Sequence, residues 1–273
     1  MNEIVLNNGI TIPQLGLGVF RVKDGEEAYN AVRYALDAGY RHIDTAAAYK
    51  NEESVGRAIR DSGIAREDIF VTTKLWTDDV RAGRAKEAYK ESLQKLGMNY
   101  VDLYLIHWPA VGYEKAWKDL EDMYLEGQMR AIGVSNFHAH HLADILPTAR
   151  VLPAMDQVES SPSFTNSELL AHIRSLNIQP EAWSPFGGSL DKNVLKDENL
   201  LQLAAKYGKS TAQVVLRWHI QQGNVVIPKS IHKERIEENL QVFDFSLSDE
   251  DVALISSFNK DIRAGSNPDT FNF

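Results

Sequence analysis

Apolar residues recur along the chain in two alternating patterns, one typical of helices and one typical of buried strands. Residues 26–38 carry apolar side chains three and four positions apart, which predicts an amphipathic helix. Gly39 follows and is expected to end this helix by adopting the left-handed conformation, and the strand-like run 40–43 comes next. The same order of helix, glycine and strand returns with predicted helices over 81–96, 114–126 and 211–222.

The strand-like runs follow one another at regular intervals. They lie at 40–43, 69–73, 101–106, 129–134, 154–158, 178–183 and 224–228, with a weaker eighth candidate at 241–243. Pro180 fits poorly inside a strand, so the start of the run 178–183 is uncertain. Near-continuous apolar strands alternating with helices predict a parallel α/β sheet. Residues 4–13, with a turn at Asn7-Asn8-Gly9, predict a small β-hairpin ahead of the first barrel strand.

Two parallel architectures fit this pattern, an open doubly wound sheet and a closed (β/α)8 TIM barrel. In an open sheet, ligand-binding residues gather at one switch point, whereas in a barrel the ends of all strands converge on a single site. Here successive strands present polar or aromatic residues at the same end: Asp44, Lys74, His107, Ser135, Asn136, Gln157, Trp183, Ser184, Lys229 and Ser230. The pattern favours a barrel formed by one domain over 1–273, with the hairpin capping its bottom.

Composition narrows the class of protein. The 273 residues, 44% of them hydrophobic, are enough for a large core, and no apolar run approaches the roughly 20 residues that span a bilayer. The N-terminus lacks the pattern of a secretory signal, and the chain has no cysteine, so disulfides and thiolate sites are excluded and a cytoplasmic location is expected. The net charge of −9 argues against nucleic acid or an anionic membrane as the partner. A small molecule is the expected partner.

An acid, a lysine, a tyrosine and a histidine are expected to meet at the mouth of the barrel: Asp44, Tyr49, Lys74 and His107. A buried carboxylate needs a partner, which Lys74 can supply. A phenol with its usual pKa of about 10 is a poor proton donor at neutral pH, and a nearby ammonium lowers that pKa. A histidine beside it can orient a carbonyl oxygen. A structural ion pair is the simpler alternative, but it leaves the tyrosine and the histidine without a role.

Several long stretches resemble the signature segments of the aldo-keto reductase superfamily: GYRHIDTAAAYKNEESVG, LYLIHWP, IGVSNF, PKSIHKERIEENLQVFDF and NPDTFNF. The chain is similar to short-looped prokaryotic members of the diketogluconate, methylglyoxal and glyoxal reductase type. The resemblance implies a monomeric, NADPH-dependent oxidoreductase that reduces small aldehydes, α-dicarbonyls or keto-sugars to alcohols. It implies that Tyr49 is the proton donor, that Lys74 and Asp44 tune its pKa, and that His107 orients the carbonyl.

The resemblance also implies where the cofactor binds. The nicotinamide would lie against a set of side chains at the strand ends: Ser135, Asn136, Gln157, Trp183 and Ser184. The adenosine 2′-phosphate and adenine would lie against a second set: Lys229, Ser230, Arg235, Glu238 and Asn239. Independently of the resemblance, the basic cluster of Lys229, Lys233 and Arg235 suits a phosphate dianion, which favours NADPH over NADH. Two departures from the family pattern are Asp156, where Asn is usual, and the run ESSPSF over 159–164.

Three aromatic residues, Phe20, Trp76 and Trp108, fall in or just after loops that would rim the site, where they and His107 could contact substrate. Each aromatic could equally be ordinary packing. The run HAHH over 138–141 could bind a metal through His138 and His141, one turn apart. The sequence shows no acidic partner for it, so we expect no functional metal.

Two other functions use the same residues. A Schiff-base aldolase would use Lys74 as its nucleophile, beside Asp44. A redox-sensing subunit would bind NADPH with negligible turnover, because fold alone does not decide function.

Overall fold

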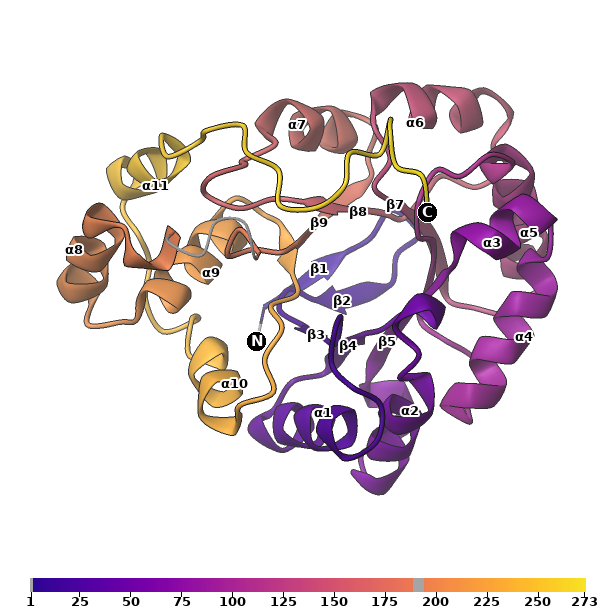
Figure 1. Ribbon diagram of the computed structural model, residues 1–273, viewed down its shortest axis with the longest axis horizontal. Helices are drawn as coiled ribbons and strands as arrows, with labels where there is room; N and C mark the ends of the chain where they lie inside the picture. The colour runs from indigo at the N-terminus through magenta and orange to yellow at the C-terminus, as the bar shows by residue number, and fades with distance from the viewer. Residues whose placement is uncertain (1, 189–193) are drawn as a thin grey trace.

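The computed structural model describes residues 2–188 and 194–273, and within them eight parallel strands form a barrel surrounded by helices (Figure 1). Backbone hydrogen bonds close it: Gly16 N–H donates to Val226 O at 2.9 Å, and Gly18 N–H donates to Pro228 O at 3.1 Å. The barrel strands are β3 (Leu17–Gly18), β4 (His42–Asp44), β5 (Phe70–Leu75), β6 (Leu103–Ile106), β7 (Ala131–Ser135), β8 (Met155–Glu159), β9 (Gln179–Trp183) and β10 (Val225–Val226). The predicted TIM barrel is confirmed.

A two-stranded antiparallel hairpin precedes the barrel, as predicted. It consists of β1 (Glu3–Val5) and β2 (Thr11–Pro13). Its side chains Leu6 and Ile12 belong to a separate apolar cluster with residues such as Phe70 and Leu103, which stand at the amino ends of their strands. The hairpin therefore covers the bottom of the barrel, opposite the ends that carry the predicted site.

Helices cover the outside of the barrel and turn their apolar stripes inward. In α1 the buried positions are Ala28, Ala31, Val32, Ala35 and Leu36, the stripe expected from the sequence. The helices are α1 (Glu26–Ala38), α2 (Glu52–Asp61), α3 (Thr77–Ala82), α4 (Ala85–Leu96), α5 (Tyr113–Leu125), α6 (Ala139–Ile145), α7 (Ser167–Ser175), α8 (Glu198–Tyr207), α9 (Thr211–Gln221), α10 (Lys233–Leu240) and α11 (Asp249–Ser256). Among the described residues, none of these helices is long and apolar enough to cross a membrane.

Two sequence predictions about elements were wrong. Residues 241–243, predicted as a strand, form a turn and a bend. The eighth barrel strand is instead β3, whose two residues are too few to show a strand pattern in the sequence. Close packing explains the glycines around β3: a Cβ on Gly16 would lie 2.5 Å from the His42 ring. The helix predicted over 81–96 is divided into α3 and α4, because Gly83 has a φ of 66° and ends α3.

The C-terminal tail after α11 crosses the barrel toward α6 (Figure 1). Glu159, at the end of β8, accepts hydrogen bonds from the backbone N–H groups of Ala264 and Gly265. Farther on, the ring of Phe273 stacks on Trp76 with the ring centroids 5.5 Å apart and the planes 2° apart. The tail is thus fastened to the face of the barrel where the strands carry their polar residues.

Candidate active site

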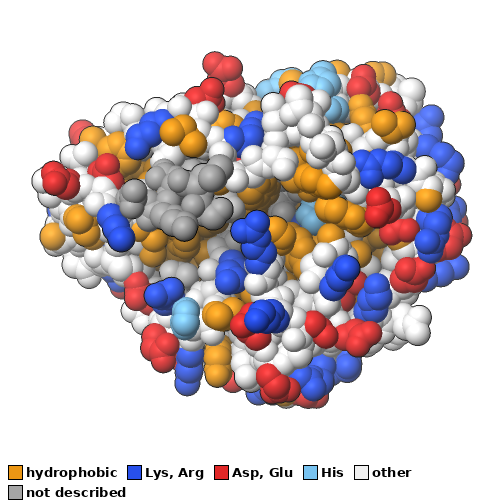
Figure 2. Space-filling view, in the orientation of Figure 1, with side chains coloured by type: hydrophobic (Ala, Val, Ile, Leu, Met, Phe, Trp, Pro, Cys, Tyr) orange, Lys and Arg blue, Asp and Glu red, His pale blue; other side chains and the backbone are white. Residues whose placement is uncertain are grey.

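A cavity of about 1210 Å³ opens at the carboxyl ends of the strands. Figure 2 shows the hollow at the centre of this face, with Lys and Arg side chains around its mouth. The lining includes most of the residues predicted from the sequence: Phe20, Asp44, Tyr49, Trp76, His107, Trp108, Ser135, Asn136, Gln157, Trp183, Ser184 and Lys229. A cavity of this size exceeds the roughly 300–1,000 Å³ of ordinary small-molecule sites, so it has room for a cofactor together with a small substrate.

Lys74 supplies the positive charge that Asp44 needs. Its Nζ donates to Asp44 Oδ1 at 2.6 Å and to Thr45 O at 2.9 Å. A third bond, 3.4 Å long, reaches Tyr49 Oη. The Lys74 side chain is 0% exposed and that of Asp44 is 2% exposed. The two residues stand on neighbouring strands β5 and β4, and Tyr49 ends the short 3-10 helix Ala47–Tyr49 that follows β4.

The electrostatics of Tyr49 differ from the sequence prediction. Desolvation by the surrounding protein raises the pKa of Tyr49 to about 12, although the Lys74 ammonium lowers it. Lys74 lowers the pKa of Tyr49, as expected, but the burial of the phenol outweighs the ion, so the net pKa lies above its ordinary value. Tyr49 keeps its proton at neutral pH, which is the state that a proton donor requires.

His107 is held as a neutral imidazole. Burial, and then the nearby Lys74 ammonium, lower the pKa of His107 well below its usual range. Its ring lies edge-on to that of Tyr49, with the centroids 5.5 Å apart. The Nδ1 atom is buried and has no hydrogen-bond partner among the described residues. A neutral ring beside the phenol is able to donate a hydrogen bond to an uncharged oxygen.

Glu181 on β9 is a buried acid that sequence reasoning missed. Gln157 Nε2 donates to Asp44 Oδ2 at 2.8 Å and to Glu181 Oε2 at 2.7 Å. Both amide hydrogens thus point at carboxyl groups, which fixes the orientation of the Gln157 side chain. Burial, and then the Asp44 charge, raise the pKa of Glu181 to about 8. The only sequence signal for Glu181 was its position between Pro180 and Ala182, where an acid interrupts an otherwise apolar strand of the barrel.

The raised pKa of Glu181 makes the stability of the fold depend on pH. Between pH 4.5, its ordinary pKa, and about 8, folded Glu181 holds a proton that the unfolded chain has released. The free energy of unfolding therefore falls as pH rises through this window. We expect the free energy of unfolding of Glu181→Gln, measured with urea, to equal that of the parent near pH 5. At pH 9 it should exceed that of the parent by on the order of 3–5 kcal/mol. Parallel pH profiles for the two proteins would contradict this assignment.

Four of the residues expected at the nicotinamide, Ser135, Asn136, Gln157 and Trp183, form one hydrogen-bonded group. Asn136 has a φ of 63°, a left-handed conformation that Asn adopts more readily than most residues. Its Nδ2 donates to His107 O at 3.0 Å, and its Oδ1 accepts from Trp183 Nε1 at 2.9 Å. Ser135 Oγ donates to Gln157 O at 2.8 Å. The strand ends β7, β8 and β9 thereby hold the Trp183 indole and the Gln157 amide at fixed positions in the cavity wall.

The predicted phosphate-binding residues lie where the chain leaves β10 and enters α10. Lys229 is exposed, lines the cavity and pairs with Gly18 of β3. Arg235 is exposed on α10, and Ser230 and Asn239 are 7% and 6% exposed. Glu238 is half-buried, and its main-chain O accepts from Gln213 Nε2. Within residues 2–188 and 194–273, neither Lys229 nor Arg235 makes an ion pair, so both cations are available to an anion.

The aromatic rim contains the three predicted residues and two that were missed. Trp108 contacts Phe271 and Phe273 of the tail, each with ring centroids 5.2 Å apart. Trp76 lies against His107 at 5.2 Å, and Phe20, which is 53% exposed, lies 5.1 Å from the Tyr49 ring. Phe271 and Phe273 belong to the sequence segment that carries the resemblance, but only the folded tail brings them to the site.

Both departures from the family pattern lie in or just after β8. Burial raises the pKa of Asp156 well above its usual range, which favours an uncharged carboxyl at the position where Asn is usual. Its Oδ1 accepts from Phe137 N–H at 3.4 Å. In the run ESSPSF, Glu159 binds the tail through Ala264 and Gly265. Neither departure alters the contacts among Asp44, Tyr49 and Lys74.

Comparison with known proteins agrees with this geometry. Residues 14–260 match the model of the aldo/keto reductase family. The chain is 48% identical over 273 residues to a glyoxal reductase of Bacillus subtilis, covering 100% of this chain and 98% of that protein. It superposes with a TM-score of 0.95 and 45% identity on an aldo-keto reductase from a deep-sea metagenome library, covering 99% of this chain and 100% of the other. A Bombyx mori aldo-keto reductase in complex with NADP matches with a TM-score of 0.92 and 41% identity, covering 98% and 96%. This chain belongs to the aldo/keto reductase family.

Proposed function

We propose that this protein is an NADPH-dependent reductase of small α-dicarbonyl compounds and related aldehydes or ketones. The observation that carries the proposal is the hydrogen-bonded set of Asp44, Lys74 and Tyr49 beside a neutral His107 in one cavity wall. The exposed cations Lys229 and Arg235 and the NADP-bound relative support the choice of cofactor. The resemblance further favours a monomer in the cytoplasm, and light scattering of the purified protein tests the oligomeric state.

The residues fit an NADP(H) molecule laid across the strand ends. The side-chain nitrogen of Gln157 donates to two carboxyl groups. Its side-chain oxygen can therefore accept a hydrogen bond from the nicotinamide carboxamide. The Trp183 indole, held by Asn136, gives a flat apolar surface for a ring. Lys229 and Arg235 would hold the 2′-phosphate, with Ser230 as a hydroxyl donor and Glu238 and Asn239 near the adenine. When bound, NADPH supplies the hydride that the carbonyl carbon receives.

The side chains of this protein orient and protonate the carbonyl oxygen of the substrate. His107 donates a hydrogen bond to the carbonyl oxygen and so orients it toward the phenol. As negative charge develops on that oxygen, Tyr49 gives it a proton, and the Lys74 ammonium stabilises the phenolate that remains. Asp44 holds Lys74 in place at 2.6 Å. Tyr49 is thus the proton donor, and His107 positions the substrate. Lys74, held by Asp44, gives the electrostatic support.

The rim of the cavity favours small substrates. Phe20, Trp76 and Trp108 surround the mouth, and the tail adds Phe273. These rings offer apolar walls beside a few polar groups, which suits a short dicarbonyl or a small aldehyde. The glyoxal reductase of Bacillus subtilis, similar over the full chain, supports an α-dicarbonyl as the first choice.

The Schiff-base aldolase alternative is not favoured. A nucleophilic lysine must be a free amine, whereas the three hydrogens of Lys74 Nζ are directed at Asp44, Thr45 and Tyr49. Burial lowers the pKa of Lys74, but its neighbours, Asp44 first among them, outweigh burial and raise the net pKa. Lys74 therefore stays an ammonium. A redox-sensing subunit remains the second candidate, distinguished by tight NADPH binding without turnover.

A substrate panel tests the proposal. NADPH oxidation is followed by absorbance with glyoxal, methylglyoxal, keto-sugars and simple aldehydes. We expect turnover to be fastest with the short dicarbonyls. NADPH binding, seen as quenching of tryptophan fluorescence, without turnover of any carbonyl would favour the sensor. Borohydride trapping of substrate on Lys74 without NADPH consumption would favour the aldolase.

Cofactor preference gives a second test. We expect Arg235→Gln to raise the KM for NADPH by roughly 10- to 100-fold, the equivalent of one charge-assisted hydrogen bond to phosphate, and to leave the KM for NADH unchanged. Lys233→Gln is the matched control: Lys233 belongs to the basic cluster in the sequence and lies on the same helix, but it pairs with Glu237 at 3.8 Å, unlike Arg235. Equal effects of Arg235→Gln on both cofactors would show that Arg235 does not bind the 2′-phosphate.

A further inference from the structure

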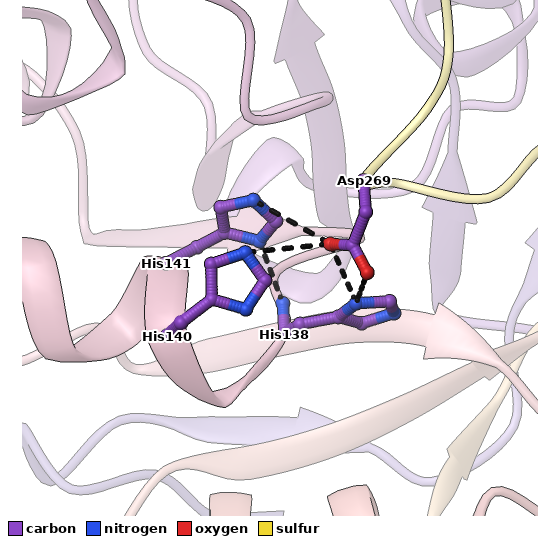
Figure 3. Close-up of side chains that lie close together, drawn as sticks. All are labelled: His138, His140, His141 and Asp269. Carbon is purple, nitrogen blue, oxygen red and sulfur yellow. Dashed lines mark hydrogen bonds and ion pairs between the residues drawn. The ribbon is translucent and has the colours of Figure 1, made fainter.

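Three histidines at the start of α6 surround one carboxylate of the C-terminal tail (Figure 3). His138 is the residue before the first turn of α6, and His140 and His141 lie within that turn. The carboxylate belongs to Asp269, 131 residues farther along the chain. The four side chains stand outside the cavity that holds the predicted catalytic residues, because none of them is part of its lining.

The distances within this cluster suit a metal ion. Asp269 Oδ1 lies 2.9 Å from His138 Nδ1, 3.4 Å from His140 Nε2 and 3.8 Å from His141 Nε2. A tetrahedral Zn²⁺ with ligands at about 2.1 Å separates them by about 3.4 Å, within the range of these three distances. One ligand atom from each of the four residues lies within 4.8 Å of all the others. No pair therefore has to close by more than about 1.4 Å to reach the tetrahedral separation.

The donor set narrows the kind of ion. Three imidazole nitrogens and one carboxylate oxygen suit Zn²⁺, Co²⁺, Ni²⁺ or Cu²⁺, whereas Mg²⁺ and Ca²⁺ prefer oxygen ligands. The sequence showed His138 and His141 but no acid near them. Asp269 is the acidic ligand that only the fold brings to this place.

We propose that His138, His140, His141 and Asp269 form a binding site for a divalent transition metal such as Zn²⁺, which fastens the C-terminal tail to α6. The consequence lies two and four residues farther on, where Phe271 and Phe273 contact Trp108 and Trp76 at the rim of the cavity. A metal on Asp269 thus holds the aromatic end of the tail over the site. The inference concerns tail anchoring and stands whether or not the proposed substrate class is right.

Two contacts must change when the metal binds. His141 Nδ1 accepts a hydrogen bond from His138 N–H at 3.0 Å, so its proton sits on Nε2 and must move to Nδ1 for Nε2 to become a ligand. The Arg263 guanidinium donates to His138 Nε2 at 3.2 Å, so the ring proton sits on Nδ1. That proton must move to Nε2 before Nδ1 becomes a ligand, and Arg263 then has to turn away from the protonated Nε2. Removing Arg263 should therefore strengthen metal binding, an effect that unspecific surface histidines would not show.

Titration of the untagged full-length protein with Co²⁺, after chelator treatment, tests the site. We expect one equivalent to bind with the intense visible absorption of tetrahedral Co²⁺, and Zn²⁺ but not Mg²⁺ to displace it. His140→Gln and Asp269→Asn should each weaken binding by at least about 10- to 100-fold, and Arg263→Gln should tighten it. The His140 side chain is 60% exposed, so its loss leaves the fold intact. His172→Gln, which removes a histidine outside the cluster, should change nothing.

Hydrogen exchange shows whether the metal fastens the tail. If opening the tail breaks the site, Zn²⁺ at 100 times its Kd should slow exchange of the backbone amides near Asp269 by about 100-fold, and Asp269→Asn should abolish this effect. Binding of Co²⁺ that Asp269→Asn leaves unchanged would overturn the proposal. So would the absence of stoichiometric binding in the parent, which would make the cluster a hydrogen-bonded contact only.

Discussion

Replacing Tyr49 by phenylalanine should lower kcat/KM for carbonyl reduction by roughly 10²- to 10⁴-fold, the usual contribution of a general acid. The substitution keeps the ring, which packs 5.1 Å from Phe20 and 5.5 Å from His107. It removes only the hydroxyl, whose one described hydrogen bond is the 3.4 Å contact with Lys74. Steady-state NADPH oxidation measures the loss.

The control for this prediction is cofactor binding. Tyr49 is expected to act on the substrate oxygen, so quenching of tryptophan fluorescence by NADPH should be the same in Tyr49→Phe and in the parent. Equal loss of binding and turnover would mean that the hydroxyl supports the cofactor. Retention of full turnover would show that another group provides the proton, with His107 as the next candidate.

Replacing Lys74 by methionine should destabilise the fold by about 3–5 kcal/mol, because it leaves Asp44 as a buried carboxylate without its cation. Asp44 is 1% exposed, and its remaining side-chain partner is Gln157 at 2.8 Å. Burial already raises the pKa of Asp44 while Lys74 lowers it, so loss of the ammonium raises this pKa further. Urea unfolding at neutral pH measures the change.

A double variant separates stability from catalysis. Lys74→Met combined with Asp44→Asn removes both charges and should recover most of the lost stability, because no uncompensated ion stays buried. It should not recover turnover, since the phenolate of Tyr49 would still lack its ammonium. Recovery of activity along with stability would show that Lys74 only supports the fold.

Strand ends were the part of this site that the sequence predicted best. Helices and strands alternate in a recognisable pattern, and in a closed barrel every strand ends at the same face. Asp44, His107 and Gln157 could therefore be placed together before any contact was known, and Lys74 with them as the partner of Asp44. The pairing of Lys74 with Asp44 followed because an unpaired buried carboxylate is unfavourable.

The features that escaped prediction depend on contacts between distant segments. β3 has two residues, too few for a pattern, and the two ends of the sheet are joined by isolated bridges, Leu15 with Val226 and Gly18 with Lys229. Glu181 looks like an isolated acid until Gln157 is seen between it and Asp44. The tail carries no period at all, so the approach of Phe273 to Trp76 and of Asp269 to His138 follows only from the fold.

The net pKa of Tyr49 also escaped prediction, for a different reason. The neighbouring cation was predicted correctly, but the desolvation of the phenol depends on how densely the cavity wall is packed. That density raises the pKa of Tyr49 to about 12 in spite of Lys74. Pairwise reasoning from residue types cannot weigh these opposing effects.

The most direct test of the central claim follows the hydride itself. The enzyme is supplied with NADPH dideuterated at C4 of the dihydronicotinamide and with methylglyoxal, and the product is examined by mass spectrometry and NMR. Reduction at this site predicts an alcohol that carries one deuterium on the former carbonyl carbon, formed by the parent and greatly reduced with Tyr49→Phe. Product without deuterium, or formed equally fast by Tyr49→Phe, would contradict the account.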